Sequence, residues 1–304
     1  MDILLKSEFW FAVIRSTTPV LFATLAANLA SKSGVINIAI EGTMLIAALV
    51  GVIASAFTNS LLLGLFFGLL SGVLVTLALS YFSLKLKSNI IITAIAINLA
   101  ATGGTVFALY TITGDKSVSA VLKSAVFPTV NIPIIRDIPF IGSTLSGHNL
   151  LTYVALISVA VIYILLYKTP LGTRIRAVGE SEAAAESVGI NINKTKTIAL
   201  VLSGMLSALG GMFLSMGYLS MFTAGMTSGR GFVALATDAM SGSNPIGGLL
   251  SSLIYGFSDS LANYLQNTAV PLQFIQAFPY VFIVIMFTVF SYVNKRKNKV
   301  EDNI

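Results

Sequence analysis

The chain has 304 residues, of which 56% are hydrophobic and 10% are charged, whereas soluble domains average roughly 45–50% apolar and about 25% charged residues. Too few polar side chains remain to cover a water-facing surface, which excludes an ordinary soluble domain. Cysteine is absent, which excludes disulfides and thiol chemistry, and a single histidine, His148, argues against a metal centre. The net charge of +6 comes without a basic patch interleaved with aromatic residues, so we expect no nucleic-acid partner.

Long apolar blocks follow one another along the chain, and each reaches the roughly 20 residues that a membrane-spanning helix needs. We expect an all-α, polytopic transmembrane helical bundle of about nine spans (8–10), which forms a single domain over residues 1–304. The seventh and eighth spans are short, and Ser241–Pro245 between them contains Gly and Pro, so the two could instead be one broken or re-entrant element. The expected spans are 9–30, 36–57, 61–84, 90–112, 149–167, 195–218, 225–241, 246–265 and 273–293.

Polar residues interrupt several of these spans. An ionisable side chain exposed to lipid costs at least about 2.5–3.5 kcal/mol, so each one indicates either a functional path or an internal partner. For Glu41 we favour a structural role, in which the carboxylate beside Gly42 clamps a half-helix. The asparagines suit interhelical hydrogen bonds and solute contacts equally well, and Asp259 is a candidate for a polar cavity near the outer end of its span. The candidate residues for a translocation path are Asn28, Asn37, Glu41 and Asn98.

Two segments between spans are longer than a turn requires. Residues 113–148 are expected to form an extracellular loop, because Pro128, Pro133 and Pro139 separate apolar runs that are too short to span. Residues 168–196 are expected to form a cytoplasmic segment whose length suggests a function of its own. Within it we predict one short helix, with Glu180 and Glu182 in its first turn, alanines in its centre and Gly189 just past its end. Its small-residue patch suits docking into a partner's groove better than lying on lipid, since it lacks a large apolar face and basic flanks.

The distribution of cations predicts the orientation of the chain. Four cations between residues 295 and 299 directly follow the last apolar run, as expected of a cytoplasmic end. Alternation then places 12 of the 18 Lys and Arg residues on the cytoplasmic side, with the N-terminus outside. The first apolar run has no basic n-region before it and no small-residue cleavage pattern, so we expect it to be a retained span. The expected location is the bacterial cytoplasmic membrane.

Several motifs resemble one transporter family. Arg174–Ile190, RIRAVGESEAAAESVGI, resembles the coupling-helix motif of permeases of the branched-chain amino acid, ribose and nucleoside importers, which are ATP-binding-cassette transporters. Ser33–Leu45, SGVINIAIEGTML, resembles their glycine-rich second-span motif and is most similar to the nucleoside and simple-sugar branch. Asn131–His148 and Gly229–Ala236 also match, so the resemblance covers nearly the whole chain in the expected order. Thr237–Ser243 departs from the family pattern, which has an apolar or aromatic stretch there.

The resemblance implies a permease subunit that is not an enzyme and holds no cofactor. It lies in the lipid bilayer, and its first expected partner is a second permease subunit, which is homologous or identical. The other expected partners are two cytoplasmic ATP-binding subunits, which bind ATP and Mg²⁺, and an extracellular substrate-binding lipoprotein. No phosphate-binding Gly-x-x-x-x-Gly-Lys-Ser/Thr motif occurs in the chain, which agrees with nucleotide binding in another subunit. The residues expected to couple to the ATPase are Gly179, Glu180, Ala183, Ala184 and Gly189.

The expected substrate is a nucleoside, with a simple sugar such as ribose as the alternative and a branched-chain amino acid third. A secondary transporter driven by an ion gradient is less favoured, because few membrane carboxylates could relay protons and the cytoplasmic helix would have no role in it. A membrane-embedded enzyme would need a convergent nucleophile and base or a cluster of ligands, and the sequence indicates neither.

Overall fold

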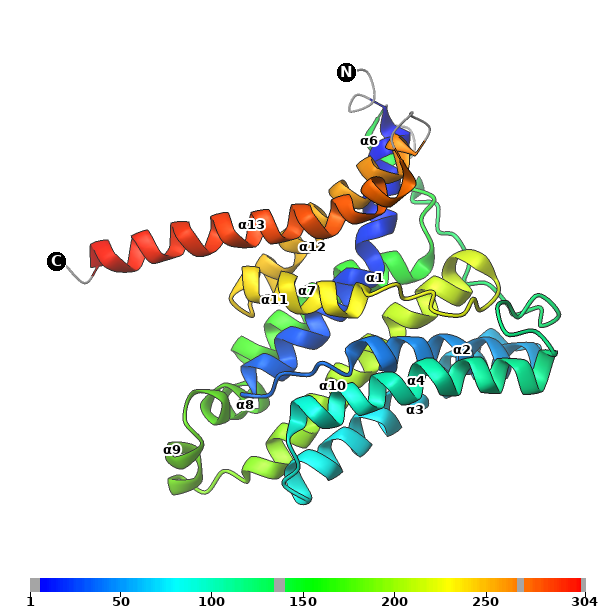
Figure 1. Ribbon diagram of the computed structural model, residues 1–304. Helices are drawn as coiled ribbons and strands as arrows, with labels where there is room; N and C mark the ends of the chain where they lie inside the picture. The colour runs from blue at the N-terminus through cyan, green and yellow to red at the C-terminus, as the bar shows by residue number, and fades with distance from the viewer. Residues whose placement is uncertain (1–5, 134–139, 267–270, 302–304) are drawn as a thin grey trace.

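A computed structural model describes residues 6–133, 140–266 and 271–301 (Figure 1). Over these ranges the chain folds into helices, together with two isolated β-bridges. The elements are α1 Ser7–Lys32, α2 Ile40–Thr58, α3 Leu61–Ser80, the π-helix η1 Tyr81–Lys85, α4 Ile90–Thr113, α6 Ile141–Leu145, α7 Leu150–Lys168, α8 Pro170–Glu180, α9 Glu182–Ser187, α10 Ile192–Met212, the π-helix η2 Phe213–Leu219, α11 Arg230–Ser241, α12 Pro245–Leu265 and α13 Leu272–Glu301.

Among the described residues, seven helices are long and apolar enough to cross a membrane. They are α1, α2, α3 with η1, α4, α7, α10 with η2, and the part of α13 from Gln273 to Phe290. The chain is therefore a multi-pass, all-α membrane protein, as the sequence predicts.

The predicted seventh span is wrong at its start. The helix begins at Arg230 rather than at residue 225, because Gly225 and Gly229 adopt positive φ angles of 68° and 77°, which a right-handed helix does not contain. The 12 residues of α11 extend only about 18 Å, too short for a hydrocarbon core of about 30 Å. The eighth predicted span is α12, which has 21 residues but contains buried serines and Asp259, and it is not among the seven apolar helices.

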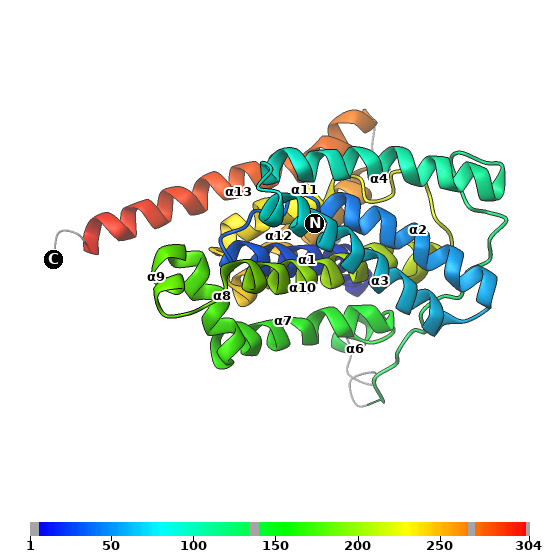
Figure 2. The ribbon, with the colours of Figure 1, turned by 90° about the horizontal axis from the view of Figure 1, so that it is seen from below.

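The helices form an inner group and an outer group. In α1, α2 and α10 the most apolar stretch is 61–67% buried, whereas in α3, α4 and α13 it is 17–22% buried. The outer helices expose large apolar side chains such as Phe66, Leu99 and Val284, which suits contact with lipid or another subunit. Figure 2 shows α1 and α10 in the middle of the bundle, between α4 and α7.

The predicted second span begins later than expected, at Ile40 instead of residue 36. After α1 ends, Gly34 adopts a φ of 75°, a left-handed conformation that glycine takes without steric strain. Residues 33–39 then run as a non-helical connection to α2, which we call the break segment.

The two ends of the bundle are formed by different segments of the chain. Figures 1 and 2 place α9 and the C-terminal end of α13 toward the same end, whereas in Figure 1 the start of α1 lies beside α6 at the other. The long connection before α7 is held to η2 and to the segment after it, since the Phe127 N–H donates to the Met216 carbonyl at 3.0 Å and Val118 forms a β-bridge with Thr223. Pro139 and Arg136 of the predicted outer loop lie outside the described residues.

Candidate functional site

Glu41 lies in the first turn of α2, and its carboxylate holds the start of α11. Oε1 accepts a hydrogen bond from the Gly229 N–H at 2.8 Å, and Oε2 accepts one from the Gly231 N–H at 2.7 Å. The first N–H groups of a helix lack intrahelical acceptors, and this end carries partial positive charge, so a carboxylate stabilises it on both counts. A Cβ at Gly231 would lie 2.6 Å from the Glu41 backbone. The two helices therefore meet too closely for any larger residue.

Two asparagines hold the break segment from either side. The Asn98 amide on α4 donates to the Ile38 carbonyl at 3.0 Å and accepts from the Gly42 N–H at 2.8 Å. Asn37 donates to the Ser203 hydroxyl on α10 at 3.0 Å and accepts from the Ala39 N–H at 3.1 Å. Asn98 lies eight residues along α4, or about 12 Å from its first residue. The Ile38 carbonyl and the Ala39 N–H of the break segment are thus paired inside the bundle, where water is scarce.

Asn28, the fourth candidate path residue, belongs to a buried polar cluster between α1, α11 and α12. Its amide donates to the Asp238 carboxylate, which also accepts from the Ser31 hydroxyl at 2.6 Å. One turn away, the Thr24 and Thr237 hydroxyls lie 2.6 Å apart, and Ser252 donates to Thr24 at 3.1 Å. The carboxylate that departs from the family pattern is therefore matched by hydrogen-bond donors from α1. All four candidates from the sequence form hydrogen bonds to other groups of the protein, and their role in a translocation path stays a prediction.

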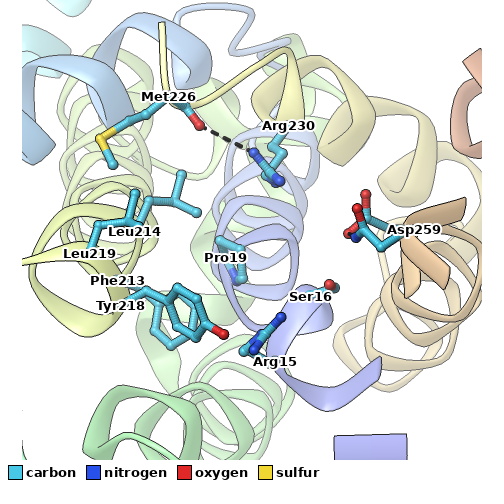
Figure 3. Close-up of a pocket in the computed structure, with 11 residues that line it drawn as sticks. Arg15, Ser16, Pro19, Phe213, Leu214, Tyr218, Leu219, Met226, Arg230 and Asp259 are labelled. Carbon is cyan, nitrogen blue, oxygen red and sulfur yellow. Dashed lines mark hydrogen bonds between the residues drawn. The ribbon is translucent and has the colours of Figure 1, made fainter. Parts of the chain in front are cut away.

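A separate polar cavity lies between α1, η2, α11, α12 and α13. It consists of two adjoining hollows of ≈ 200 Å³ and ≈ 340 Å³, and both are lined by Arg230, Asp259 and Asn263. The first is also lined by Arg15 and Ser16 from α1 and by apolar side chains of η2, and Figure 3 shows Arg15 and Asp259 directed toward it from different helices. The second extends between α12 and α13 to Tyr280.

The charged groups of this cavity are held apart from one another. The Arg15 guanidinium lies 4.3 Å from the ring centroid of Tyr218, in a cation–π contact. The Asp259 carboxylate accepts from the Asn263 amide at 3.3 Å, and it forms no ion pair with Arg15 among the interactions of the described residues. Arg230 donates to the Met226 carbonyl at 3.2 Å. The cavity therefore presents a donor side at Arg15 and an acceptor side at Asp259.

Pro19 lies inside α1 and has no N–H, so it cannot donate to the carbonyl four residues earlier, that of Arg15. Both residues line the cavity.

His148 lies just before α7, next to the start of α1. Its ring stacks on Phe11 with the centroids 3.9 Å apart, and Nε2 lies 2.8 Å from the Thr144 carbonyl. Burial lowers the pKa of the imidazole below its ordinary value, the hydrogen bond to Thr144 opposes this, and the Arg15 charge adds to it. The neutral ring, which donates through Nε2, is therefore the form that fits this site.

The predicted coupling helix is divided in the structure, so one part of the prediction is wrong. Glu180 ends α8, whereas Glu182 begins α9, because the Ser181 hydroxyl accepts from the Ala184 N–H at 3.3 Å and starts a new helix. Glu180 thus lies at a C-terminus, where the helix dipole does not favour an acid. The predicted end is confirmed, since Gly189 follows α9 with a φ of 81°.

The surface of α9 presents small residues. Ala183 and Ala184 are exposed, whereas Ala185 is buried toward the bundle. Glu182 pairs with Lys196 of α10 at 2.7 Å, which ties this short helix to a membrane helix. Gly179, at the end of α8, packs directly on the backbone of Lys32 and Gly34. The cytoplasmic segment and the break segment are therefore in contact.

Sequence reasoning missed most of the cavity. It assigned no role to Arg15, and it placed Arg230 only within a motif and on the outer side. The prediction that Asp259 faces a polar cavity is confirmed, because it lines both hollows. A usable signal for Arg15 was the proline four residues later in the same apolar run.

Comparisons with known proteins agree on one kind of protein. A family model described as "Branched-chain amino acid transport system / permease component" matches residues 9–290. The guanosine ABC transporter permease protein NupQ of Bacillus subtilis is 31% identical over 258 residues, 83% of this chain and 80% of its own length. The nucleoside ABC transporter permease protein NupC of Lactococcus lactis is 28% identical over 285 residues, 90% of this chain and 89% of its own. Among solved structures, PsaBC from Streptococcus pneumoniae has a similar fold, with a TM-score of 0.50 at 14% identity over 91% of this chain and 89% of that one.

Proposed function

The chain belongs to the family of permease components of branched-chain amino acid transport systems, and from this membership we propose that it forms the translocation path for a nucleoside in a bacterial ATP-binding-cassette importer. Two relatives that match most of the chain are permeases for guanosine and for nucleosides. A simple sugar and a branched-chain amino acid are the other substrates that this family membership allows.

The observation that carries the nucleoside assignment is the chemistry of the cavity. Arg15, Arg230 and Asp259 line the cavity, and Glu41, which does not line it, binds the backbone on either side of Arg230. With Glu41 counted, these four charges sum to zero, which favours a neutral solute, because an ion would leave its water without a counter-charge. The side chains of η2, including Tyr218, form a partly apolar wall. The flat base of a nucleoside can cover this wall, whereas a sugar does not require it.

The proposed topology has nine passages. Residues 220–229 together with α11 make the seventh, and α12 makes the eighth, so that α9 and the end of α13 lie in the cytoplasm and the start of α1 lies outside. This arrangement agrees with the excess of Lys and Arg on the cytoplasmic side. It also places the opening of the cavity, near the ends of η2 and α12, toward the extracellular side.

The proposed assembly contains a second permease, two ATP-binding subunits that bind ATP and Mg²⁺, and an extracellular binding lipoprotein. The small exposed face of α9, formed by Ala183 and Ala184, is the proposed contact with an ATP-binding subunit, with Gly179, Glu180 and Gly189 at the ends of the two short helices. Because α8 and α9 are anchored to α1, α7 and α10, a movement at this contact is passed to the membrane helices.

The test is uptake of labelled guanosine, ribose and leucine by cells that carry the complete system, with and without this subunit. We expect deletion of the subunit to abolish guanosine uptake alone. If deletion removes ribose or leucine uptake and leaves guanosine uptake intact, the nucleoside assignment fails and the permease assignment stands. If none of the three changes, the substrate belongs to another class.

A further inference from the structure

Arg15 and Asp259 face the same cavity without neutralising each other. They lie on different helices, α1 and α12, and each is held by its own neighbour: Arg15 by the Tyr218 ring at 4.3 Å and Asp259 by the Asn263 amide at 3.3 Å. Both side chains are half-buried. Opposite charges that share a small cavity would gain energy by pairing, and the structure instead keeps them apart.

The gap between them suits a solute that accepts hydrogen bonds at one end and donates them at the other. We propose that Arg15 and Asp259 contact the substrate, Arg15 through the base and Asp259 through the ribose hydroxyls of a nucleoside. This proposal rests on the proposed function and assigns an orientation within it.

The chemistry of each side supports this orientation. A guanidinium presents planar donors that match paired acceptors on a purine edge, and Arg15 lies against the Tyr218 ring in the wall of the cavity. A carboxylate only accepts hydrogen bonds, so it matches the two adjacent hydroxyls of ribose, which donate. The apolar side chains of Phe213, Leu214 and Leu219 lie on the Arg15 side of the cavity, where a base would be buried.

The available space agrees with a ligand of this size. The two hollows measure ≈ 200 Å³ and ≈ 340 Å³, and pockets for small ligands span roughly 300–1,000 Å³. The second hollow is the more polar of the two in its residues, with Gln266, Gln276 and Tyr280. Asp259 lines both hollows, so a ribose bound there would lie between the apolar wall and the polar one.

The experiment measures uptake of labelled guanosine and 2′-deoxyguanosine by the complete importer carrying Asp259→Asn or Arg15→Lys. Each rate is divided by the wild-type rate, which cancels the selectivity of the unchanged binding protein. We expect Asp259→Asn to slow guanosine about tenfold more than 2′-deoxyguanosine, since both nucleosides carry the 3′-hydroxyl but only guanosine also donates a 2′-hydroxyl hydrogen bond to the charged acceptor. Arg15→Lys should slow both to the same extent, because it changes contacts to the base.

Controls separate binding from folding. Asp115→Asn changes an exposed carboxylate of the outer connection and should leave both rates as in the wild type, and the amount of each variant in the membrane is measured by immunoblot. If Asp259→Asn does not accumulate, Asp259→Glu replaces it; this keeps the charge but moves the carboxylate by one methylene, and it should show the same preference for loss of guanosine uptake.

Equal slowing of both nucleosides by the Asp259 variants overturns the ribose contact, and unchanged rates in the Arg15 variant overturn the base contact. Failure of the proposed function looks different, because the wild-type importer would then take up neither nucleoside. If that importer takes up leucine instead, and both variants abolish leucine uptake, the charged pair binds the carboxylate and ammonium groups of an amino acid and the nucleoside orientation is wrong.

Discussion

Replacing Glu41 with Gln tests whether the carboxylate clamp holds the start of α11. The carboxylate accepts two hydrogen bonds from backbone N–H groups, at 2.8 and 2.7 Å. Gln keeps one carbonyl oxygen, but its NH₂ group would face the second N–H, so one bond is lost. A hydrogen bond to a charged group contributes about 1.5–3 kcal/mol.

This loss predicts a local change in dynamics. The free energy of opening at the first turn of α11 should fall by about 1.5–3 kcal/mol, which corresponds to about 10- to 150-fold faster amide exchange. Hydrogen–deuterium exchange of the protein in lipid nanodiscs, followed by mass spectrometry of peptides covering residues 225–235, measures it directly. Amides in α3, which are distant from the clamp, should exchange as in the wild type.

The matched control is Glu186→Gln, which removes an exposed carboxylate from α9 and should leave exchange at residues 225–235 unchanged. If Glu41→Gln also leaves it unchanged, the two hydrogen bonds do not stabilise α11. If both variants speed exchange equally, the effect comes from net charge and not from the clamp.

Three further predictions concern the two surfaces of the membrane. A tag inserted near Lys123 should react with an impermeant reagent in intact cells, and an unreactive tag contradicts the proposed orientation. Ala184→Arg should abolish substrate-stimulated ATP hydrolysis without reducing the amount of protein in the membrane, because the long cation would collide with a docked partner. The control variant Ala184→Ser should keep this hydrolysis. Normal hydrolysis in the arginine variant rejects the docking surface. Because the folded pKa of His148 is lowered, the unfolded state takes up a proton first as the pH falls below about 6.5, so stability is lost below that pH and fully present above it. The thermal unfolding midpoint should fall from about pH 7.5 to about pH 5, and it should fall further for the wild type than for His148→Gln. Equal falls in the two proteins would show that His148 does not cause the loss of stability.

The helices were predictable from sequence because apolar run length alone decides whether a segment can cross a bilayer. The breaks were predictable only in part. Glycine and proline near Ser241–Pro245 indicated an interruption, but the start of α11 at Arg230 depends on the positive φ angles of Gly225 and Gly229. The divided coupling segment was missed because Ser181 fits a helix interior as well as a cap, and its hydrogen bond to Ala184 decides between the two.

The sequence could not predict the complete cavity. The cavity brings together residues from α1, η2, the start of α11, and the adjoining ends of α12 and α13, which are up to about 265 positions apart in the chain. Polarity marked Asp259 as a candidate, but nothing in its own segment indicated that Arg15 would lie across from it. The four polar residues that the sequence singled out form hydrogen bonds inside the protein, and because a buried side-chain amide can bond to a neighbouring helix or to a solute with the same groups, the sequence could not assign them to one role.

The contact between Gly34 and Gly179 has a mechanical consequence. An ideal Cβ on Gly34 would lie 3.3 Å from the Gly179 Cα, so main chain rests on main chain with no side chain between them. A side chain could absorb a small displacement by rotating about χ1, but a backbone joint has no such compliance. A shift of α8 by more than a few tenths of an ångström must therefore carry residues 33–39 with it. The cytoplasmic segment and the stretch that leads to Glu41 behave as one stiff linkage.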